Sequence, residues 1–305
     1  MKCVKCRDKA TVHIRRHNSA FCQPCFMEYF TNQVARAIKE DRMFTHEDRV
    51  LVAVSGGKDS LALWDVLITL GYETAGLHIH QGIFEYSASS YVKTTRFAEA
   101  RGLKLITVDL AAEGNLEIPT VAGSTRRTEC SACGLIKRHY FNSVAVEGGF
   151  TVMATGHNLD DEAARLLGNV LRWQSAYLAV QSPVLEATHP RLVKKVKPLY
   201  RLSEYETASY AFLQGIDYIV EECPFSHDAI QLQYKEVLNQ LEHRSPGTKQ
   251  SFVLGFQREG RKAFAATTDV HLKECISCGY PTTGDICGFC RLQQEVQKGK
   301  TRMRS

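Results

Sequence analysis

Most of the eleven cysteines of this 305-residue chain stand in pairs separated by two residues, and two such pairs lie near each end. A two-residue gap lets both thiolates reach one metal ion, and two pairs complete the tetrahedron that Zn²⁺ prefers. A redox CxxC motif is the alternative, but it would be expected once, beside a thioredoxin-like pattern. The sequence therefore predicts two structural zinc sites, held by Cys3, Cys6, Cys22 and Cys25 and by Cys275, Cys278, Cys287 and Cys290.

Three cysteines remain outside these sites, Cys130, Cys133 and Cys223. The first two belong to a stretch with Ser and Gly that we expect to form a loop before a helix. Three thiolates suit an iron–sulfur cluster with one iron left open, by analogy with the cysteine-ligated sites of ferredoxins. Two other interpretations stay open. One is a persulfide-carrying cysteine that later closes a disulfide, and the other is buried free cysteines.

A glycine-rich turn, Ser-Gly-Gly-Lys-Asp-Ser at 55–60, follows an apolar run at 50–54. Glycines let the backbone approach a ligand, and the first amides of a following helix attract anions. Lys58 adds positive charge, and Ser55 and Ser60 add hydroxyl donors. The turn is not a Walker A loop, because Val52 stands where that motif has its first glycine, and it is not a GxGxxG fingerprint, because Gly56 and Gly57 are adjacent. It predicts a phosphate-binding loop, and an ordinary strand–helix turn is the alternative.

A second polar turn, Ala-Thr-Gly-His-Asn-Leu-Asp-Asp-Glu-Ala at 154–163, also follows an apolar run and opens a helix. Either Asp160 or Asp161 is expected to cap that helix. The other carboxylate is expected to meet Mg²⁺ on the phosphates, because Mg²⁺ prefers a few carboxylates together with phosphate oxygens.

Apolar runs alternate with helical patterns around these turns. Strands are expected at 50–54, 74–80, 104–109 and 151–155, and helices at 59–70, 87–101, 134–147 and 159–172. This alternation predicts an α/β fold with a doubly wound parallel sheet, which binds ligands at the carboxyl ends of its strands. Residues 200–243 are expected to form two helices with a strand-like segment at 215–220 between them. The basic run at 189–201 is either a solvated loop or edge strand, or a nucleic-acid surface.

The composition is that of a globular protein, with 44% hydrophobic and 23% charged residues. The net charge of +5 favours a polyanionic partner only weakly. No apolar run approaches the roughly 20 residues of a membrane span, and no apolar signal region stands at the N-terminus. We therefore expect a cytoplasmic protein without a membrane partner.

The motifs together resemble a known family. The 55–60 turn looks like the PP-loop of the N-type ATP pyrophosphatases, and the 154–163 turn resembles that family's second motif. Over essentially its whole length, the chain resembles the TtuA-type tRNA 2-thiouridine synthetases of the TtcA/TtuA family. The motifs that carry this resemblance, besides the two turns, are both cysteine quartets, His-Gln-Gly-Ile-Phe-Glu-Tyr-Ser at 80–87, Cys-Ser-Ala-Cys-Gly, Glu-Glu-Cys-Pro and the terminal Cys-Gly-Tyr-Pro-Thr-Thr-Gly.

The resemblance implies a role for each motif. Each quartet would bind one Zn²⁺, and Cys130, Cys133 and Cys223 would hold a [4Fe–4S] cluster and take part in catalysis. Lys137 and Asp161 would be the other residues most directly involved in catalysis. ATP, with Mg²⁺, would contact Ala53, Ser55, Gly56, Gly57, Lys58, Asp59, Ser60, Ile79, Lys137 and Gly156.

The implied reaction adenylates the C2 carbonyl oxygen of a tRNA uridine, 5-methyluridine 54 in this family, and replaces it with sulfur. The sulfur would come from a ubiquitin-like carrier protein with a C-terminal thiocarboxylate, and the enzyme would be a homodimer. The ribbons and the basic tail at 291–305 would hold the tRNA backbone.

Alternative functions stay open at this point. One is a PP-loop thiolase that acts on wobble uridine 34 or cytidine 32, and another is a PP-loop amidotransferase or ligase. A third, of another class, is a non-catalytic zinc-ribbon protein that binds tRNA. The domain division expected is a zinc ribbon at 1–30, a PP-loop catalytic domain with the iron–sulfur site at 31–225, a helical extension at 226–270, and a second ribbon with a basic tail at 271–305.

Overall fold

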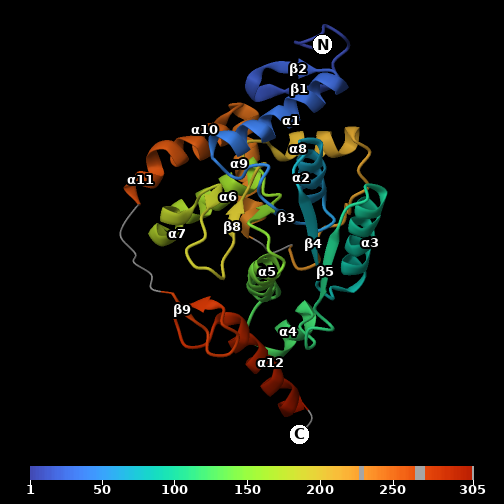
Figure 1. Cartoon of the computed structure of the whole chain (residues 1–305). Coiled ribbons are helices and arrows are strands. Elements are labelled where there is room, and N and C mark those ends of the chain that lie inside the picture. Colours follow the sequence, from blue (N-terminus) through green and yellow to red (C-terminus); the bar gives the residue numbers. More distant parts are fainter. Residues whose placement is uncertain (227–229, 265–271, 304–305) are drawn as a thin grey trace.

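A computed structural model describes residues 1–226, 230–264 and 272–303 (Figure 1). In these residues one sheet has the strand order β5-β4-β3-β6-β8-β7, in which all neighbours run parallel except β7, which is antiparallel to β8 at one edge. Its strands are β3 (Val50–Ala53), β4 (Thr74–His80), β5 (Leu105–Asp109), β6 (Val152–Thr155), β7 (Val184–Leu185) and β8 (Lys194–Val196). The predicted α/β fold with a mostly parallel sheet is confirmed.

Helices cover both faces of this sheet. The helices of the described residues are α1 (Gln23–Glu40), α2 (Lys58–Thr69), α3 (Phe84–Ala100), α4 (Ile118–Ser124), α5 (Glu129–Glu147), α6 (Leu159–Leu171), α7 (Ser175–Val180), α8 (Glu204–Leu213), α9 (Ile230–Arg244), α10 (Thr248–Gly255), α11 (Arg261–Ala263) and α12 (Gly288–Met303). A 3₁₀ turn (Arg15–His17) and a π-helical segment (Phe256–Gly260) complete them.

Successive residues of β3 face opposite sides of the sheet, which divides the core in two. Val50 and Val52 pack with apolar residues of α1, α2, α6 and α8. Leu51 packs on the other side with residues of α4, α5 and α12. Both clusters are built from fully buried aliphatic and aromatic side chains, so the sheet is held rigidly between two helical layers.

Two helices begin earlier than the sequence pattern indicates. Helix α3 begins at Phe84 rather than at 87, and α5 begins at Glu129 rather than at 134. The expected loop around Cys130 and Cys133 is therefore wrong, because both residues lie in the first two turns of α5. The start of α5 is difficult to predict because Ser, Cys and Gly have low helix propensity. In the structure, Thr128 has the extended backbone of an N-cap residue.

The strand-like segment at 215–220 is not a strand, and that prediction is wrong. Its Ile219 N–H donates to the Gly56 carbonyl of the glycine-rich turn at 2.9 Å. Lys93 forms an ion pair with Asp217 in the same segment. The segment supports the turn from outside the sheet, in which β6 is flanked by β3 and β8.

Most of the basic run at 189–201 is loop, as one interpretation expected, but Lys194–Val196 form β8, which lies between β6 and β7 and is not an edge strand. Acidic partners neutralise much of its charge. Lys197 is buried and pairs with Glu162 at 2.8 Å, and Arg201 pairs with Glu40 and Asp41. A run whose charges are paired within the chain is a poor nucleic-acid surface.

The two cysteine-rich units lie at opposite ends of the molecule (Figure 1). Strands β1 (Val12–Ile14) and β2 (Ser19–Phe21) form a hairpin that leads into α1. At the other end, β9 (Lys273–Glu274) and β10 (Pro281–Thr282) form a second hairpin, and the basic tail continues as α12. Among the described residues, no helix is both long and apolar enough to cross a membrane.

The second ribbon is attached to α5. The rings of His139 and Phe289 are stacked with centroids 3.8 Å apart and an angle of 6°. The fully buried Asn142 donates to the Tyr280 hydroxyl at 2.9 Å and accepts from the Val193 N–H at 3.3 Å. The position of α5 therefore depends on both the sheet and the C-terminal ribbon.

Candidate active site

The glycine-rich turn joins β3 to α2 at the carboxyl edge of the sheet, and hydrogen bonds within the turn fix its conformation. The Ser60 hydroxyl donates to the Gly57 carbonyl at 2.9 Å and accepts from the Ser55 N–H at 3.1 Å. Gly56 has φ +77°, and a Cβ there would lie 2.6 Å from the Ser90 carbonyl oxygen. Only glycine fits this position, so the turn has a fixed shape with its amides at the start of α2.

The second polar turn lies directly against the first. A Cβ on Gly156 would lie 2.9 Å from the backbone of Asp59 and Ser60, so the two turns touch through their main chains. The fully buried Asn158 side chain joins them, because its amide donates to the Asp59 carboxylate at 3.2 Å. The two motifs, about a hundred residues apart in sequence, thus form one surface.

Asn158, and neither aspartate, is the N-cap of α6, so the expected cap was wrong. Its side-chain oxygen accepts from the N–H groups of Asp160 and Asp161, and Asp161 completes a capping box by accepting from the Asn158 N–H. Asp160 is buried, pairs with Lys249 and accepts from the Glu204 N–H at 2.8 Å. Asp160 therefore has a structural role, which leaves Asp161 as the carboxylate beside the phosphate loop.

A chain of ion pairs surrounds the loop. Lys58 contacts Asp59 at 3.1 Å and Glu204 at 2.8 Å, while Lys235 contacts Asp161 at 2.7 Å and Glu204 at 3.2 Å. Burial opposes both ammonium charges, but these carboxylates overcome it and raise the pKa values of Lys58 and Lys235.

The carboxylates in these ion pairs differ in how readily they ionise. Burial raises the pKa of Asp59 despite the nearby Lys58. For Asp161 burial acts in the same direction, yet Lys235 and His157 lower its pKa. Asp161 is therefore the more readily ionised of the two, which suits a carboxylate that holds a cation.

A small cavity opens beside the phosphate loop on the α5 side of the sheet. It is lined by Ala53, Val54, Ser55, Leu77, Ile79, Gln81, Lys137 and Phe141. Three residues expected to contact ATP away from the turn, Ala53, Ile79 and Lys137, thus share one cavity. Its volume of about 50 Å³ holds only part of a nucleotide, and its apolar walls and single cationic side chain are of the kind that contact a nucleoside and its first phosphate.

The three remaining cysteines lie near one another, and Cys133 contacts a residue that lines this cavity. The Cys133 thiol donates to Gln81, which lines the cavity, at 3.2 Å, and the Cys130 thiol donates to the Phe225 carbonyl at 3.3 Å. Burial and the thiols of Cys223 and Cys133 raise the pKa of Cys130, and Lys137 opposes that rise. The three cysteines and Lys137 are therefore electrostatic neighbours.

The thiols of Cys130, Cys133 and Cys223 fit the [4Fe–4S] cluster that the family resemblance implies. Among the described residues, only the two quartets bring their sulfurs within 4.8 Å of one another, and the cysteine trio does not. Four thiolates on one zinc ion must lie close together, whereas ligands of a four-iron cluster bind different irons and lie further apart. All three thiols are free and half-buried or exposed.

The quartets fit zinc ribbons. Burial opposes ionisation of Cys3, but N–H groups of Cys6, Cys22 and Lys5 lower its pKa to about 6. In the second quartet, N–H groups of Cys287 and Ser277 lower the pKa of Cys275 to about 6 in the same way. Backbone amides that stabilise a thiolate are the usual surroundings of a structural zinc ligand.

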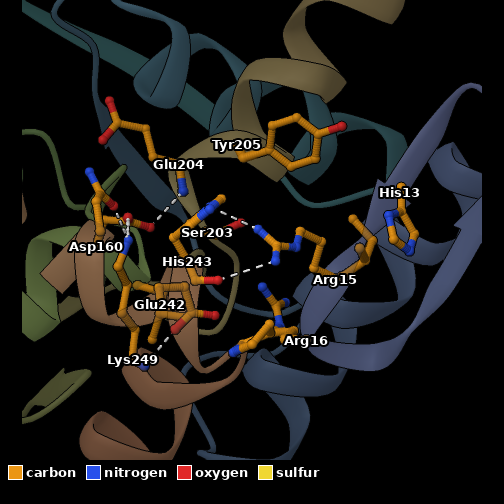
Figure 2. A pocket seen from close by; sticks show the side chains of 14 residues that line it. His13, Arg15, Arg16, Asp160, Ser203, Glu204, Tyr205, Glu242, His243 and Lys249 are labelled. Carbon is orange, nitrogen blue, oxygen red and sulfur yellow. Dashed lines mark hydrogen bonds and ion pairs between the residues drawn. The ribbon is translucent and has the colours of Figure 1, made fainter.

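A larger cavity of about 640 Å³ lies between the first ribbon and helices α8 to α10 (Figure 2). Its charged lining is partnered within the protein. Arg15 bonds to His243 at 3.0 Å, and Arg16 pairs with the fully buried Glu206. None of the residues predicted to act on ATP or sulfur lines it, so we assign the chemistry to the small cavity.

Sequence reasoning missed three residues of this site. Gln81 had a usable signal, because it directly follows the carboxyl end of a parallel strand. Glu204 lies one residue after Ser203 in a Ser-x-x-Glu capping box, which marks a helix start but gives no hint of Lys58. Lys235 had no signal, since it is one of many lysines on amphipathic helices.

Comparison with known proteins agrees with this geometry. The family described as a PP-loop domain matches residues 27–228, and the N-terminal LIM domain of the 2-thiouridine synthetase TtuA matches residues 2–27. The tRNA-5-methyluridine(54) 2-sulfurtransferase of Thermus thermophilus is 50% identical over 298 residues, covering 98% of this chain and 92% of that protein. The protein of the same name from Thermotoga maritima is 42% identical, with 99% of each chain covered.

A solved structure is also similar. The U34-tRNA thiolase NcsA from Methanococcus maripaludis, with its [4Fe–4S] cluster, has a TM-score of 0.79 at 26% identity and covers 96% of each chain. The relatives named for position 54 are thus much closer in sequence than this one. The chain therefore belongs to the PP-loop family and, within it, to the ATP-using tRNA-5-methyluridine(54) 2-sulfurtransferases.

Proposed function

We propose that this protein uses ATP to activate the C2 carbonyl oxygen of 5-methyluridine 54 in tRNA and replaces that oxygen with sulfur. One observation carries the proposal. Helix α5 brings Lys137, which lines the nucleotide cavity, and two of the three unassigned cysteines to the same site. The Gln81–Cys133 bond links that cavity to the cysteines directly. A protein that only bound tRNA would have no need for this arrangement.

Adenylation would take place at the phosphate loop. The uridine oxygen attacks the α-phosphorus, the bond to the β-phosphate oxygen breaks, and pyrophosphate leaves. Lys58 and the amides of the loop would stabilise the departing pyrophosphate, and Lys137 would neutralise charge on the α-phosphate. Asp161 would hold Mg²⁺ on the phosphates. Ala53, Ile79 and Gly156 would place the nucleoside, since they lie at the walls of the site.

Sulfur transfer would then complete the exchange. Hydrosulfide attacks C2, the C–O bond breaks, AMP leaves and the hydrosulfide proton is released, so that no oxidant or reductant is consumed. The [4Fe–4S] cluster, when held by Cys130, Cys133 and Cys223, would supply an iron at which sulfide is bound. Gln81 and Lys137 line the small cavity, and Gln81 also bonds to Cys133, so these two side chains would orient the reacting groups.

The surroundings of the reaction are part of the proposal. Each quartet would hold one Zn²⁺ and stabilise a tRNA-facing unit at one end of the chain. We propose a ubiquitin-like carrier protein with a C-terminal thiocarboxylate as the sulfur source and a homodimer as the working form, because the family resemblance implies both. We also propose the cytoplasm as the location, because the similar proteins are named as tRNA-modifying enzymes. Light scattering and pull-down of the carrier would test the first two of these points.

Thiolation of wobble uridine 34 is the second candidate, because the similar solved structure is named for that position. The closer relatives favour position 54. Anaerobic incubation with ATP, sulfide and a tRNA that contains both uridines would decide. Mass spectrometry of nuclease fragments should place the new sulfur in the T-loop fragment, and sulfur in the anticodon fragment would overturn the assignment to position 54.

A further inference from the structure

Lys235 lies on α9, beyond the residues that match the PP-loop family. Helix α9 packs tightly along α6, since a Cβ on Gly168 of α6 would lie 2.8 Å from the Tyr234 ring. Gln231, one helical turn before Lys235, donates to the Asp161 carbonyl at 3.2 Å. The position of Lys235 beside the second motif is therefore fixed by the packing of two helices.

One carboxylate joins Lys235 to the lysine of the phosphate loop. Glu204 Oε1 lies 2.8 Å from Lys58 Nζ, and Glu204 Oε2 lies 3.2 Å from Lys235 Nζ. An oxyanion whose two oxygens bridge two ammonium groups has the same pattern of charge and acceptors as a phosphoryl group. Glu204 thus occupies the kind of position that a phosphate of ATP would take between the two lysines.

Glu204 is one of the residues that line the larger cavity, together with Arg15 and Arg16. Figure 2 shows its side chain directed away from these arginines, and its carboxylate bonds to Lys58 of the phosphate loop. Its backbone N–H is bonded to Asp160, so the start of α8 is anchored while the carboxylate remains free to exchange partners. The carboxylate is 39% exposed, whereas Lys58 and Lys235 are about half as exposed.

The local charge needs both lysines. Asp59, Asp161 and Glu204 carry three negative charges against the two positive charges of Lys58 and Lys235. Without Lys235 the excess of negative charge would double, and the site would repel a polyphosphate. Mg²⁺ alone would have to offset that repulsion.

We propose that Lys235 binds the β,γ-pyrophosphate of ATP together with Lys58, and that Glu204 holds the two lysines in place until the phosphates displace it. This inference rests on the proposed role of the phosphate loop. It adds a second pyrophosphate-binding residue, supplied by the helical extension. A purely structural role, in which Lys235 only joins α9 to α6 and α8, makes a different prediction.

Binding measurements on the full-length protein without tRNA separate the two roles. Isothermal titration with α,β-methylene-ATP, pyrophosphate and AMP, each with Mg²⁺, would compare wild type with Lys235→Gln, Lys235→Arg and Lys58→Gln. Arg244→Gln, at the exposed end of the same helix, removes the same charge and is the matched control. A charge-assisted hydrogen bond to a phosphate predicts that Lys235→Gln weakens the first two ligands about tenfold.

Lys235→Gln should leave AMP affinity within about twofold, Lys235→Arg should keep most of the affinity, and Arg244→Gln should change nothing. Unchanged pyrophosphate affinity in Lys235→Gln, or an equal loss for AMP, would overturn the inference. If Lys58→Gln is also without effect, the proposed phosphate loop itself is wrong, so the two failures are distinguishable.

Glu204→Gln provides a test in which the variant is expected to gain affinity for pyrophosphate rather than lose it. It removes the charge that the phosphates must displace, so pyrophosphate should bind about threefold more tightly or better. Weaker pyrophosphate binding by Glu204→Gln would show that the carboxylate helps to bind the phosphates. It would contradict the proposal that the phosphates displace Glu204 from the two lysines.

Discussion

Lys137 and Gln81 show how single side chains at the carboxyl edge of the sheet connect nucleotide chemistry to sulfur chemistry. Both line the small cavity, and both influence the cysteine trio, Gln81 through a hydrogen bond to Cys133 and Lys137 through its charge. The sequence motif indicated Lys137 but not Gln81. A motif records which residue types recur, whereas the bond to Cys133 depends on how α5 is placed against β4.

Replacing Lys137 tests its role at the α-phosphate. Lys137→Gln should lower the rate of AMP release about a hundredfold, because a preorganised charge that meets the developing negative charge is lost. Arg138→Gln, its exposed neighbour on α5, should stay within about twofold. Single-turnover assays with saturating tRNA would measure both rates, and equal losses in the two variants would contradict the role given to Lys137.

At the scale of elements, the strand–turn–helix units were predictable and the contacts between them were not. The β3–α2 and β6–α6 units follow from apolar runs that end at glycines and polar caps. Strand β8 was expected at most as an edge strand, because the lysines of this run indicate solvent exposure. Lys197, directly after β8, is instead buried and paired with the distant Glu162. The Lys58–Glu204 and Lys235–Asp161 pairs likewise join residues 146 and 74 positions apart.

Asn158 gives an element-scale prediction because it has two functions. Asn158→Ala should cost about 1 kcal/mol of stability through the lost helix cap, and it should also weaken ATP binding. Asn158→Ser should keep the cap, but its shorter side chain has no amide to donate to Asp59. Thermal melts and ATP titrations should therefore show most of the stability restored with nucleotide binding still weak. Recovery of both properties in the serine variant would refute the link between the two motifs.

His139 gives a pH prediction for the contact between α5 and the second ribbon. Burial lowers its pKa from 6.5 to about 4, so between these values the unfolded chain binds a proton that the folded protein does not. Stability should therefore fall as the pH falls through this window, and His78, with a pKa near 4, contributes in the same direction.

His139→Phe keeps the stack on Phe289 without the ionisable group, so its melting temperature should fall less between pH 7 and pH 5 than that of the wild type. His46→Phe is the control, because His46 also stacks on an aromatic ring but is exposed. Parallel slopes for wild type and His139→Phe would show that His139 has no part in the acid sensitivity.

At the scale of the whole molecule, two cysteine quartets enclose one catalytic domain, and their contributions differ. The first packs with α1 and the phosphate-loop side, whereas the second holds α5, which carries two of the trio. The two four-cysteine sites could be predicted from cysteine spacing alone. Their places at opposite ends of the molecule could not, because spacing contains no information about distant packing.

Loss of the second zinc site should therefore disturb the cluster more than loss of the first. Cys278→Ser should reduce iron bound after anaerobic reconstitution by about half or more, because α5 loses its support. Cys6→Ser, which removes the equivalent exposed ligand of the first quartet, should leave iron close to the wild-type level. Metal analysis with an absorption spectrum would measure this, and equal iron in both variants would show that the second ribbon does not support the cluster.

The central claim is that Cys130, Cys133 and Cys223 deliver sulfur to a uridine that ATP has activated at the adjoining cavity. The most direct measurement is anaerobic thiolation of tRNA with ATP and sulfide by wild type and Cys223→Ser, with the product identified by nucleoside mass spectrometry and zinc measured in the same samples. Wild type should form 2-thio-5-methyluridine with one AMP for each thionucleoside, while Cys223→Ser should keep its zinc and form none. Thionucleoside formation at the wild-type rate by Cys223→Ser would contradict the account.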